Sequence, residues 1–199
     1  MFRMPQSASN LTTLIGIDPG SSKMGICIMV VDAVTLEIIS TDAFTIVGEK
    51  LMKKNSFMGY IHGERFARID AIEERVLAIL ERTQPFDVAS ESPFFNPGRP
   101  NAFEVLVEVI YMIRKALWRH NPWLRLYRID PPTVKKGVGA KSADGKDAVG
   151  KAVIALAPVL NYIGITPLHK LDDNARDAIA VAKTRLEILR GTLCHKPRH

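Results

Sequence analysis

Four acidic side chains stand where they could bind a metal ion together. Asp18 closes one apolar run and Glu91 closes another. Such runs predict buried strands whose carboxyl ends can share a sheet edge, so Asp18 and Glu91 are expected to lie close together. Asp173 and Asp177 are four residues apart in a helical pattern, which puts them on one helix face. Carboxylate oxygens from three elements suit Mg²⁺ or Mn²⁺ rather than zinc, and two such ions can promote phosphodiester hydrolysis.

Each of these acids also has a purely structural interpretation. Asp18 precedes a Pro-Gly pair and could form an Asx-type turn. Asp172 or Asp173 could be the N-cap of the last helix. Glu91 could be a solvated strand end. The metal-site interpretation therefore depends on the acids occurring together in one chain.

The elements that must position the acids predict one α/β domain with a mixed sheet. Strands are predicted at residues 12–18, 24–31, 36–46, 86–91 and 124–129, and the tight turns between the first three favour an antiparallel arrangement. Helices are predicted at 64–82, at 102–118, in a short segment opened by Pro131-Pro132, in an apolar stretch to Leu160, and at 173–189. Residues 50–63 and 93–100 are predicted to be irregular. We expect residues 1–199 to form a single domain with flexible ends at about 1–11 and 191–199.

The charge distribution favours a polyanionic partner. The chain has 27 Lys and Arg against 21 Asp and Glu, and the net charge is −2 over residues 1–99 but +8 over residues 100–199. A basic half on an otherwise balanced chain is typical of nucleic-acid binders. Two cysteines, Cys27 in a strand core and Cys194 in a tail, make no disulfide framework, and no apolar run approaches a membrane span. The sequence thus predicts a cytosolic protein without membrane contact.

Three segments resemble the acidic motifs of RuvC-type Holliday-junction resolvases in order and approximate spacing. They are Leu-Ile-Gly-Ile-Asp-Pro-Gly-Ser at 14–21, Ala-Ser-Glu at 89–91 and Asp-Asn-Ala-Arg-Asp-Ala-Ile-Ala at 173–180. The resemblance covers roughly residues 13–187. It implies an RNase H-like fold with a central mixed five-stranded sheet flanked by helices. The polar segment 47–63 and the insert at 95–100 resemble phage or viral members more than bacterial housekeeping ones.

The resemblance implies a metal-dependent endonuclease that resolves four-way DNA junctions by paired nicks. Two Mg²⁺ ions per site, or Mn²⁺ in their place, would be held by Asp18, Glu91 and Asp177. The family has an acid where this chain has Asn174, so Asp173 is the expected substitute, with Asp172 and Asn174 left open. A broader nuclease that cuts flaps and replication forks is the alternative function.

The resemblance also assigns DNA contacts. Phe94 matches an aromatic that stacks on a base at the opened junction, although it could instead fold onto the core. Lys135 and Lys146 match two lysines near the scissile phosphate. The neighbouring Lys136 and Lys141 are expected DNA contacts, or else part of a solvated charge run.

Two symmetric cuts in a four-way junction call for a homodimer. Helix 102–118 is a candidate interface or a core helix, through Phe103, Leu106, Val107, Ile110 and Ile113.

Two rival functions come from other classes. The segment 16–21 also resembles the first phosphate loop of actin-like ATPases, but a second phosphate loop is missing. A non-cutting junction-binding protein is disfavoured by the intact acids.

Overall fold

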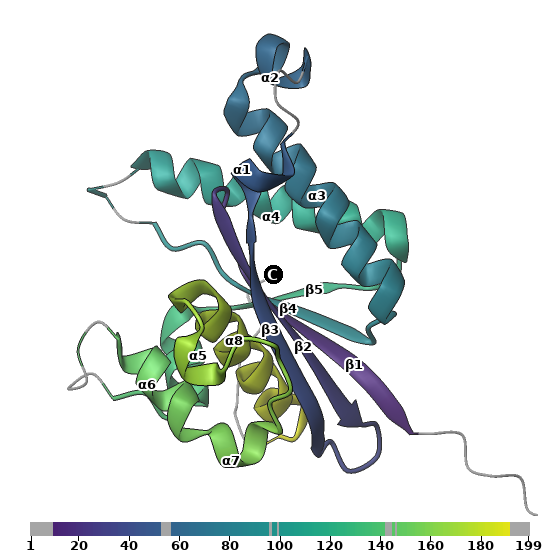
Figure 1. Cartoon of the computed structure of the whole chain (residues 1–199), viewed down its shortest axis with the longest axis vertical. Coiled ribbons are helices and arrows are strands. Elements are labelled where there is room, and N and C mark those ends of the chain that lie inside the picture. Colours follow the sequence, from purple (N-terminus) through teal and green to yellow (C-terminus); the bar gives the residue numbers. More distant parts are fainter. Residues whose placement is uncertain are drawn as a thin grey trace, which may run out of the picture.

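The computed structural model describes residues 10–52, 57–95, 97–98, 100–141, 145 and 147–191 (Figure 1). The described strands are β1 (Leu11–Asp18), β2 (Lys23–Asp32), β3 (Ile38–Val47), β4 (Asp87–Glu91) and β5 (Leu126–Ile129). The described helices are α1 (Gly48–Leu51), α2 (Phe57–His62), α3 (Glu64–Thr83), α4 (Pro100–His120), α5 (Pro131–Gly137), α6 (Ala148–Ala155), α7 (Ala157–Leu160), the 3₁₀ turn η2 (Leu168–Lys170) and α8 (Asp173–Leu189).

The strands form one mixed sheet in the order β3-β2-β1-β4-β5. The pairs β1–β2 and β2–β3 are antiparallel, whereas β4 runs parallel to both β1 and β5. The predicted mixed sheet and its antiparallel first three strands are therefore confirmed. The third strand begins at Ile38 rather than at residue 36, because Leu36 has a φ of 57° in the turn that precedes it.

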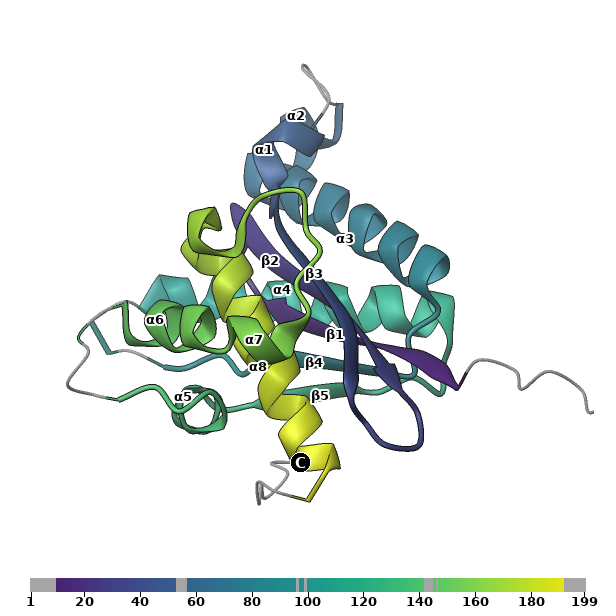
Figure 2. The ribbon, with the colours of Figure 1, turned by 60° about the horizontal axis from the view of Figure 1, so that its bottom comes forward.

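Helices cover both faces of this sheet (Figures 1 and 2). Alternate residues of β1 point to opposite sides, as the period of two requires. Ile15 and Ile17 join a core with α3 and α4, while Leu14 joins a core with α8, α5 and α6. Helical spacing predicts one buried face of α3 made of Phe66, Ile69, Ile72, Val76 and Ile79. The last four are buried, but Phe66 is exposed, so the prediction was wrong for this residue.

Helix α8 lies unusually close to the sheet because two glycines face it. A Cβ atom on Gly16 of β1 would lie 2.4 Å from the carbonyl oxygen of Ala178. A Cβ atom on Gly25 of β2 would lie 1.9 Å from the carbonyl oxygen of Asn174. Real Cβ atoms do not approach backbone this closely, so both positions need glycine for α8 to reach its place.

A buried ion pair anchors α8 to the other half of the sheet. The buried Arg185 guanidinium donates to Asp87 at the start of β4, with Nη2 at 2.6 Å from Oδ2. The same guanidinium lies 3.2 Å from the ring centre of Tyr127 on β5. Leaving one charge of such a pair buried alone costs about 3–5 kcal/mol, which makes this contact a strong constraint on the position of α8.

Two predicted regions differ in detail from the structure. The segment 50–63, predicted to be a loop, contains part of α1 and the whole of α2 among its described residues. The helix predicted to run to Leu160 is divided into α6 and α7, with a proline in the first turn of α7. Cys27 is fully buried in β2, as predicted, and Cys194 lies outside the described residues. No helix within the described ranges is long and apolar enough to cross a membrane.

Candidate functional site

Three acidic side chains from three elements meet at one edge of the sheet. Parallel pairing of Ile17 with Ser90 puts the next residues, Asp18 and Glu91, at adjacent carboxyl ends of β1 and β4. Asp177 lies in the second turn of α8, which packs on β1. The shared sheet edge predicted for Asp18 and Glu91 follows directly from this register.

Burial and mutual repulsion make these three acids reluctant to ionise. Desolvation, followed by the charges of Asp177 and Glu91, raises the pKa of Asp18 to about 8. Desolvation and Asp177 raise the pKa of Glu91 to about 7, and desolvation and Asp173 raise the pKa of Asp177 to about 6. Each carboxylate therefore adds to the cost of ionising its neighbours, and a cation placed among them would relieve that cost.

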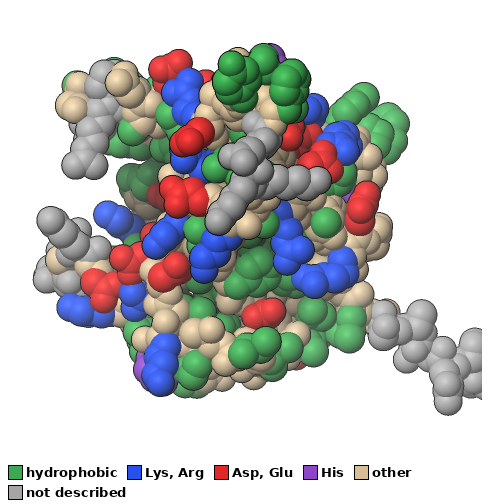
Figure 3. Space-filling model, turned by 45° about the horizontal axis from the view of Figure 1, so that its top comes forward, with side chains coloured by type: hydrophobic (Ala, Val, Ile, Leu, Met, Phe, Trp, Pro, Cys, Tyr) green, Lys and Arg blue, Asp and Glu red, His purple; other side chains and the backbone are tan. Residues whose placement is uncertain are grey.

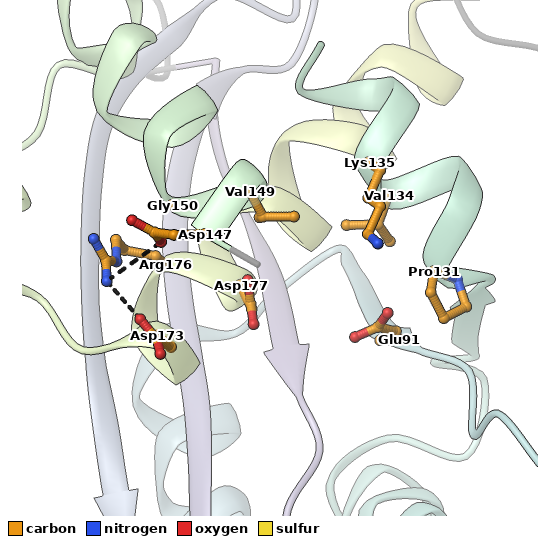
Figure 4. Close-up of a pocket in the computed structure, with 10 residues that line it drawn as sticks. All are labelled: Glu91, Pro131, Val134, Lys135, Asp147, Val149, Gly150, Asp173, Arg176 and Asp177. Carbon is orange, nitrogen blue, oxygen red and sulfur yellow. Dashed lines mark hydrogen bonds and ion pairs between the residues drawn. The ribbon is translucent and has the colours of Figure 1, made fainter. Parts of the chain in front are cut away.

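An open depression of about 200 Å³, here called the acidic hollow, lies beside these groups (Figure 4). Its lining residues are Glu91, Pro131, Val134, Lys135, Asp147, Val149, Gly150, Asp173, Arg176 and Asp177. Glu91 lies on one side and Asp177 and Asp173 lie on the other. Asp18 is not part of the lining, although its charge interacts with those of Asp177 and Glu91.

Lys135 is the predicted lysine that the structure brings to this hollow. Its charge lowers the pKa of both Glu91 and Asp177, against the stronger effects that raise them. The Asp130 carboxylate caps α5 by accepting from the Thr133 N–H at 3.0 Å. The Thr184 hydroxyl of α8 donates to the Val134 carbonyl at 3.2 Å. Helix α5, and with it Lys135, is thereby attached to the helix that carries Asp177.

The structure separates the roles of the acids at the start of α8. Asp172 is the N-cap: its Oδ1 accepts from the Ala175 N–H at 3.1 Å and from the Thr45 hydroxyl at 2.5 Å. Asp172 therefore serves as the cap of α8, with both hydrogen bonds made within the chain. The Asp173 side chain is 82% exposed and accepts from Arg176 at 2.5 Å, so it lies at the rim of the hollow. Asp177 is the more enclosed of the two acids on this helix face.

Arg176 is the residue of the hollow that the sequence interpretation missed. Its Nη2 lies 2.5 Å from Asp173 and 3.8 Å from Asp147, which joins the start of α8 to the start of α6 (Figure 4). Its Nε is buried and has no hydrogen-bond partner in the described structure. The sequence feature that could have identified Arg176 is its position inside the third acidic motif, directly before Asp177.

The other described residues that were predicted to contact DNA do not line the acidic hollow. The Phe94 side chain is 69% exposed, which excludes the alternative in which it folds onto the core. Its neighbour Phe95 makes the intramolecular contact instead, edge-on to Phe103 at 5.5 Å. Lys136 and Lys141 are exposed and do not line the hollow. Lys146 lies outside the described residues.

The donor set suits a hard divalent cation by its chemistry. The hollow offers carboxylate oxygens, and neither His nor Cys is among its lining residues. Within the described ranges, however, no group of three or more His, Cys, Asp or Glu side chains is arranged to hold a metal ion as it stands. The acids therefore fit Mg²⁺ or Mn²⁺ by type and by their mutual repulsion, and binding would require their side chains to converge further.

Comparison with known proteins identifies the fold. The structure of Thermus thermophilus RuvC in complex with a Holliday junction substrate has a TM-score of 0.64 and 18% identity, over 94% of this chain and 99% of that one. A second T. thermophilus RuvC structure has a TM-score of 0.63 and 21% identity over the same shares. The yeast mitochondrial Holliday junction resolvase has a TM-score of 0.58 and 10% identity, over 91% of this chain and 84% of that one. No protein-family model and no curated protein sequence matches the chain. The likeness confirms the RNase H-like fold.

Proposed function

We propose that this chain is a metal-dependent endonuclease that resolves four-way DNA junctions by paired nicks. The observation that carries the proposal is the meeting of Asp18, Glu91 and Asp177 beside Lys135. The fold supports it, because the solved structures of similar fold include RuvC with a Holliday junction substrate. We propose that residues 1–199 act as one nuclease domain.

The three carboxylates would hold two Mg²⁺ ions, with Mn²⁺ able to substitute. When bound, these ions would activate the attacking water and neutralise charge on the phosphate. The charges of both Asp177 and Glu91 raise the pKa of Asp18, so the Asp18 carboxylate would help to hold both ions. Asp173, at the rim, would assist Asp177 rather than replace it. Hydrolysis would leave a 3′-hydroxyl and a 5′-phosphate.

Lys135 would contribute a positive charge at the phosphate. Its charge lowers the pKa of both Glu91 and Asp177, so its ammonium group acts on acids from both sides of the acidic hollow. A fixed cation there would stabilise the negative charge that builds on the phosphate oxygens in the transition state. Lys146 remains a proposed second cation, on the sequence resemblance alone.

DNA would approach across a surface of mixed charge. Figure 3 shows Lys and Arg side chains spread over the face viewed there, with acidic side chains among them. The exposed Phe94 follows β4 by three residues, so it extends from the same sheet edge as Glu91 and could stack on an unpaired base. Lys136 and Lys141 would contact the DNA backbone without sequence preference.

We further propose that the active form is a homodimer, since paired nicks in a near-symmetric junction require two sites. The face of α4 predicted for this contact needs correction, because Ile110 and Ile113 are buried in the chain's own core. Three exposed apolar side chains, Val107 and Tyr111 of α4 and Phe66 of α3, instead line a depression of about 520 Å³. A Tyr111→Glu variant that stays dimeric by light scattering would refute this interface.

The function is tested by competition among DNA structures. The protein is incubated with Mg²⁺ and an equimolar mixture of end-labelled four-way junction, Y-fork, flap and linear duplex. We expect paired nicks in the four-way junction only, loss of nicking in Asp18→Asn, and retained junction binding in that variant. Asp32→Asn is the matched control, because Asp32 is also a strand-end acid but lies in an exposed turn away from the hollow.

The other results would each change the proposal. Equal cutting of forks and flaps would replace junction resolution with a broader branched-DNA nuclease. Binding without cutting, with Mg²⁺ or Mn²⁺, would indicate a non-catalytic junction-binding protein. Nicking by Asp18→Asn at the wild-type rate would refute the assignment of the site.

A further inference from the structure

A second surface with unusual side chains lies at the connection between α4 and β5. It comprises Arg114 and Trp118 of α4, and Trp123 and Arg125 of the segment that leads into β5; we call it the tryptophan surface. The two indoles are the chain's two tryptophans, and their residues are 68% and 89% exposed. Indoles bury a large apolar area when they find a partner, so the exposed Trp118, with the exposed Trp123 close to it in the sequence, indicates a contact surface.

The arginines of this surface have no partner among the residues that the structure describes. Neither Arg114 nor Arg125 forms an ion pair or hydrogen bond with another described residue. The nearby Arg119, in contrast, is bound to Glu73 and Glu74 of α3. Glu73 and Glu74 are thus already paired with Arg119, and the guanidinium groups of Arg114 and Arg125 remain available to an anion.

The side chains of Arg114 and Arg125 line the same depression as the indole of Trp118. Arg114 and Trp118 are four residues apart on α4, so they lie one above the other on one helix face. Trp118, Arg114 and Arg125 line an open depression of about 310 Å³, whose other walls are the apolar side chains of Leu117, Pro122, Leu124 and Leu126. An indole that shares a depression with two guanidinium groups can stack on a base while the cations contact nearby phosphates.

The tryptophan surface is separate from the acidic hollow. Leu126 begins β5, and three residues further along the strand Ile129 pairs with Glu91. About 10 Å of strand therefore separates the start of β5 from the sheet edge that holds the acids. None of the residues that line the depression at the tryptophan surface also lines the acidic hollow. Both surfaces could be occupied at the same time.

We propose that the tryptophan surface is a binding site for single-stranded nucleic acid. A single strand is favoured over a duplex because exposed indoles can stack only on bases whose faces are accessible. It is favoured over an acidic peptide because the exposed indole of Trp118 can stack on bases, which an acidic peptide lacks, while Arg114 and Arg125 at the same depression can contact phosphates. The site does not depend on the proposed nuclease activity and would hold an unpaired strand away from the acids.

The test uses the two tryptophans as their own reporters. An oligothymidylate of about 15 nucleotides is titrated into the whole protein in a chelating buffer, which prevents any cutting. We expect saturable quenching of tryptophan fluorescence and little quenching by a duplex of the same length. Trp118→Ala should weaken binding about 5-fold to 100-fold while Trp123 still reports it. The double variant Arg114→Ala/Arg125→Ala keeps both indoles. It should reduce the slope of the logarithm of the binding constant against the logarithm of the salt concentration by about 1.4.

Arg75→Ala is the matched control, since Arg75 is an exposed arginine of α3 that pairs with no other described residue. It should bind the oligonucleotide as the wild type does, and thermal melts establish that every variant is folded. Binding without fluorescence change, or binding unaffected in both Trp118→Ala and the double arginine variant, would overturn the proposal. So would equal quenching by the duplex, or quenching by an acidic Glu-Leu peptide but not by the oligonucleotide. Because the assay contains no metal, its failure would leave the junction-nicking result unaffected.

Discussion

Neutralising Asp18 should stabilise the metal-free protein at alkaline pH. The pKa of this carboxyl is raised from 3.8 to about 8, so the folded chain holds the proton more tightly than the unfolded chain does. Stability therefore falls as pH rises from about 4 to about 8. Each pKa unit corresponds to about 1.4 kcal/mol, so the ionised carboxylate disfavours folding by about 5–6 kcal/mol above pH 8 and by about 2 kcal/mol at pH 5.

The expected difference between those two conditions is on the order of 4 kcal/mol for Asp18 alone. Glu91 and Asp177 act in the same direction, since their pKa values are also raised, to about 7 and about 6. The assay is urea unfolding, followed by circular dichroism, at a series of pH values in a chelating buffer. Asp18→Asn should flatten the upper part of the profile and should be the more stable protein at about pH 8.5 by a few kcal/mol.

A control separates this effect from a general loss of negative charge. The pKa of Asp32 is lowered by hydrogen bonds from the backbone of Thr35 and Val34, so Asp32→Asn should not flatten the alkaline part of the profile. Mg²⁺ should stabilise the wild type at alkaline pH and should stabilise Asp18→Asn much less, because the ion then binds one carboxylate fewer. A wild-type stability that does not change between about pH 5 and pH 8.5, or an Asp18→Asn variant that is less stable at alkaline pH, would refute the reasoning.

Three further predictions concern single contacts of the site and fold. Lys135→Ala should slow single-turnover junction nicking by about 10²-fold with little change in thermal stability, while the exposed neighbour variant Lys136→Ala should stay within about 2-fold. Asp177→Asn should abolish nicking, whereas Asp173→Asn should only reduce it, because the Asp173 carboxylate lies at the rim and pairs with an arginine; equal losses in Mg²⁺ titrations would contradict this ranking. Gly16→Ala should cost several kcal/mol in urea unfolding, since its Cβ would meet the α8 backbone at 2.4 Å, and a variant as stable as wild type would show that α8 can shift.

The local sequence pattern was sufficient for the five strands, for the long helices α3, α4 and α8, and for the acids that end β1 and β4. Asp18 and Glu91 close apolar runs, and a run that forms a buried strand must leave its last residue at the sheet edge. Asp173 and Asp177 are related by helical spacing alone. These inferences depend only on neighbours in the chain, whereas the start of β3 at Ile38 rather than at residue 36 was not predicted.

Only the tertiary structure determined which of several chemically similar side chains is a helix cap, is buried or is exposed. Asp172 and Asp173 are adjacent and chemically identical, yet only Asp172 reaches Thr45, on a strand 127 residues earlier in the chain, and serves as the cap. Phe66 fits the apolar period of α3 but is exposed, because the segments that pack on α3 leave this side chain uncovered. The exposure of Trp118 depends on how α4 meets β5. The burial of a side chain and its distance from other charges depend on segments that are distant in the sequence, so a local sequence pattern cannot predict them.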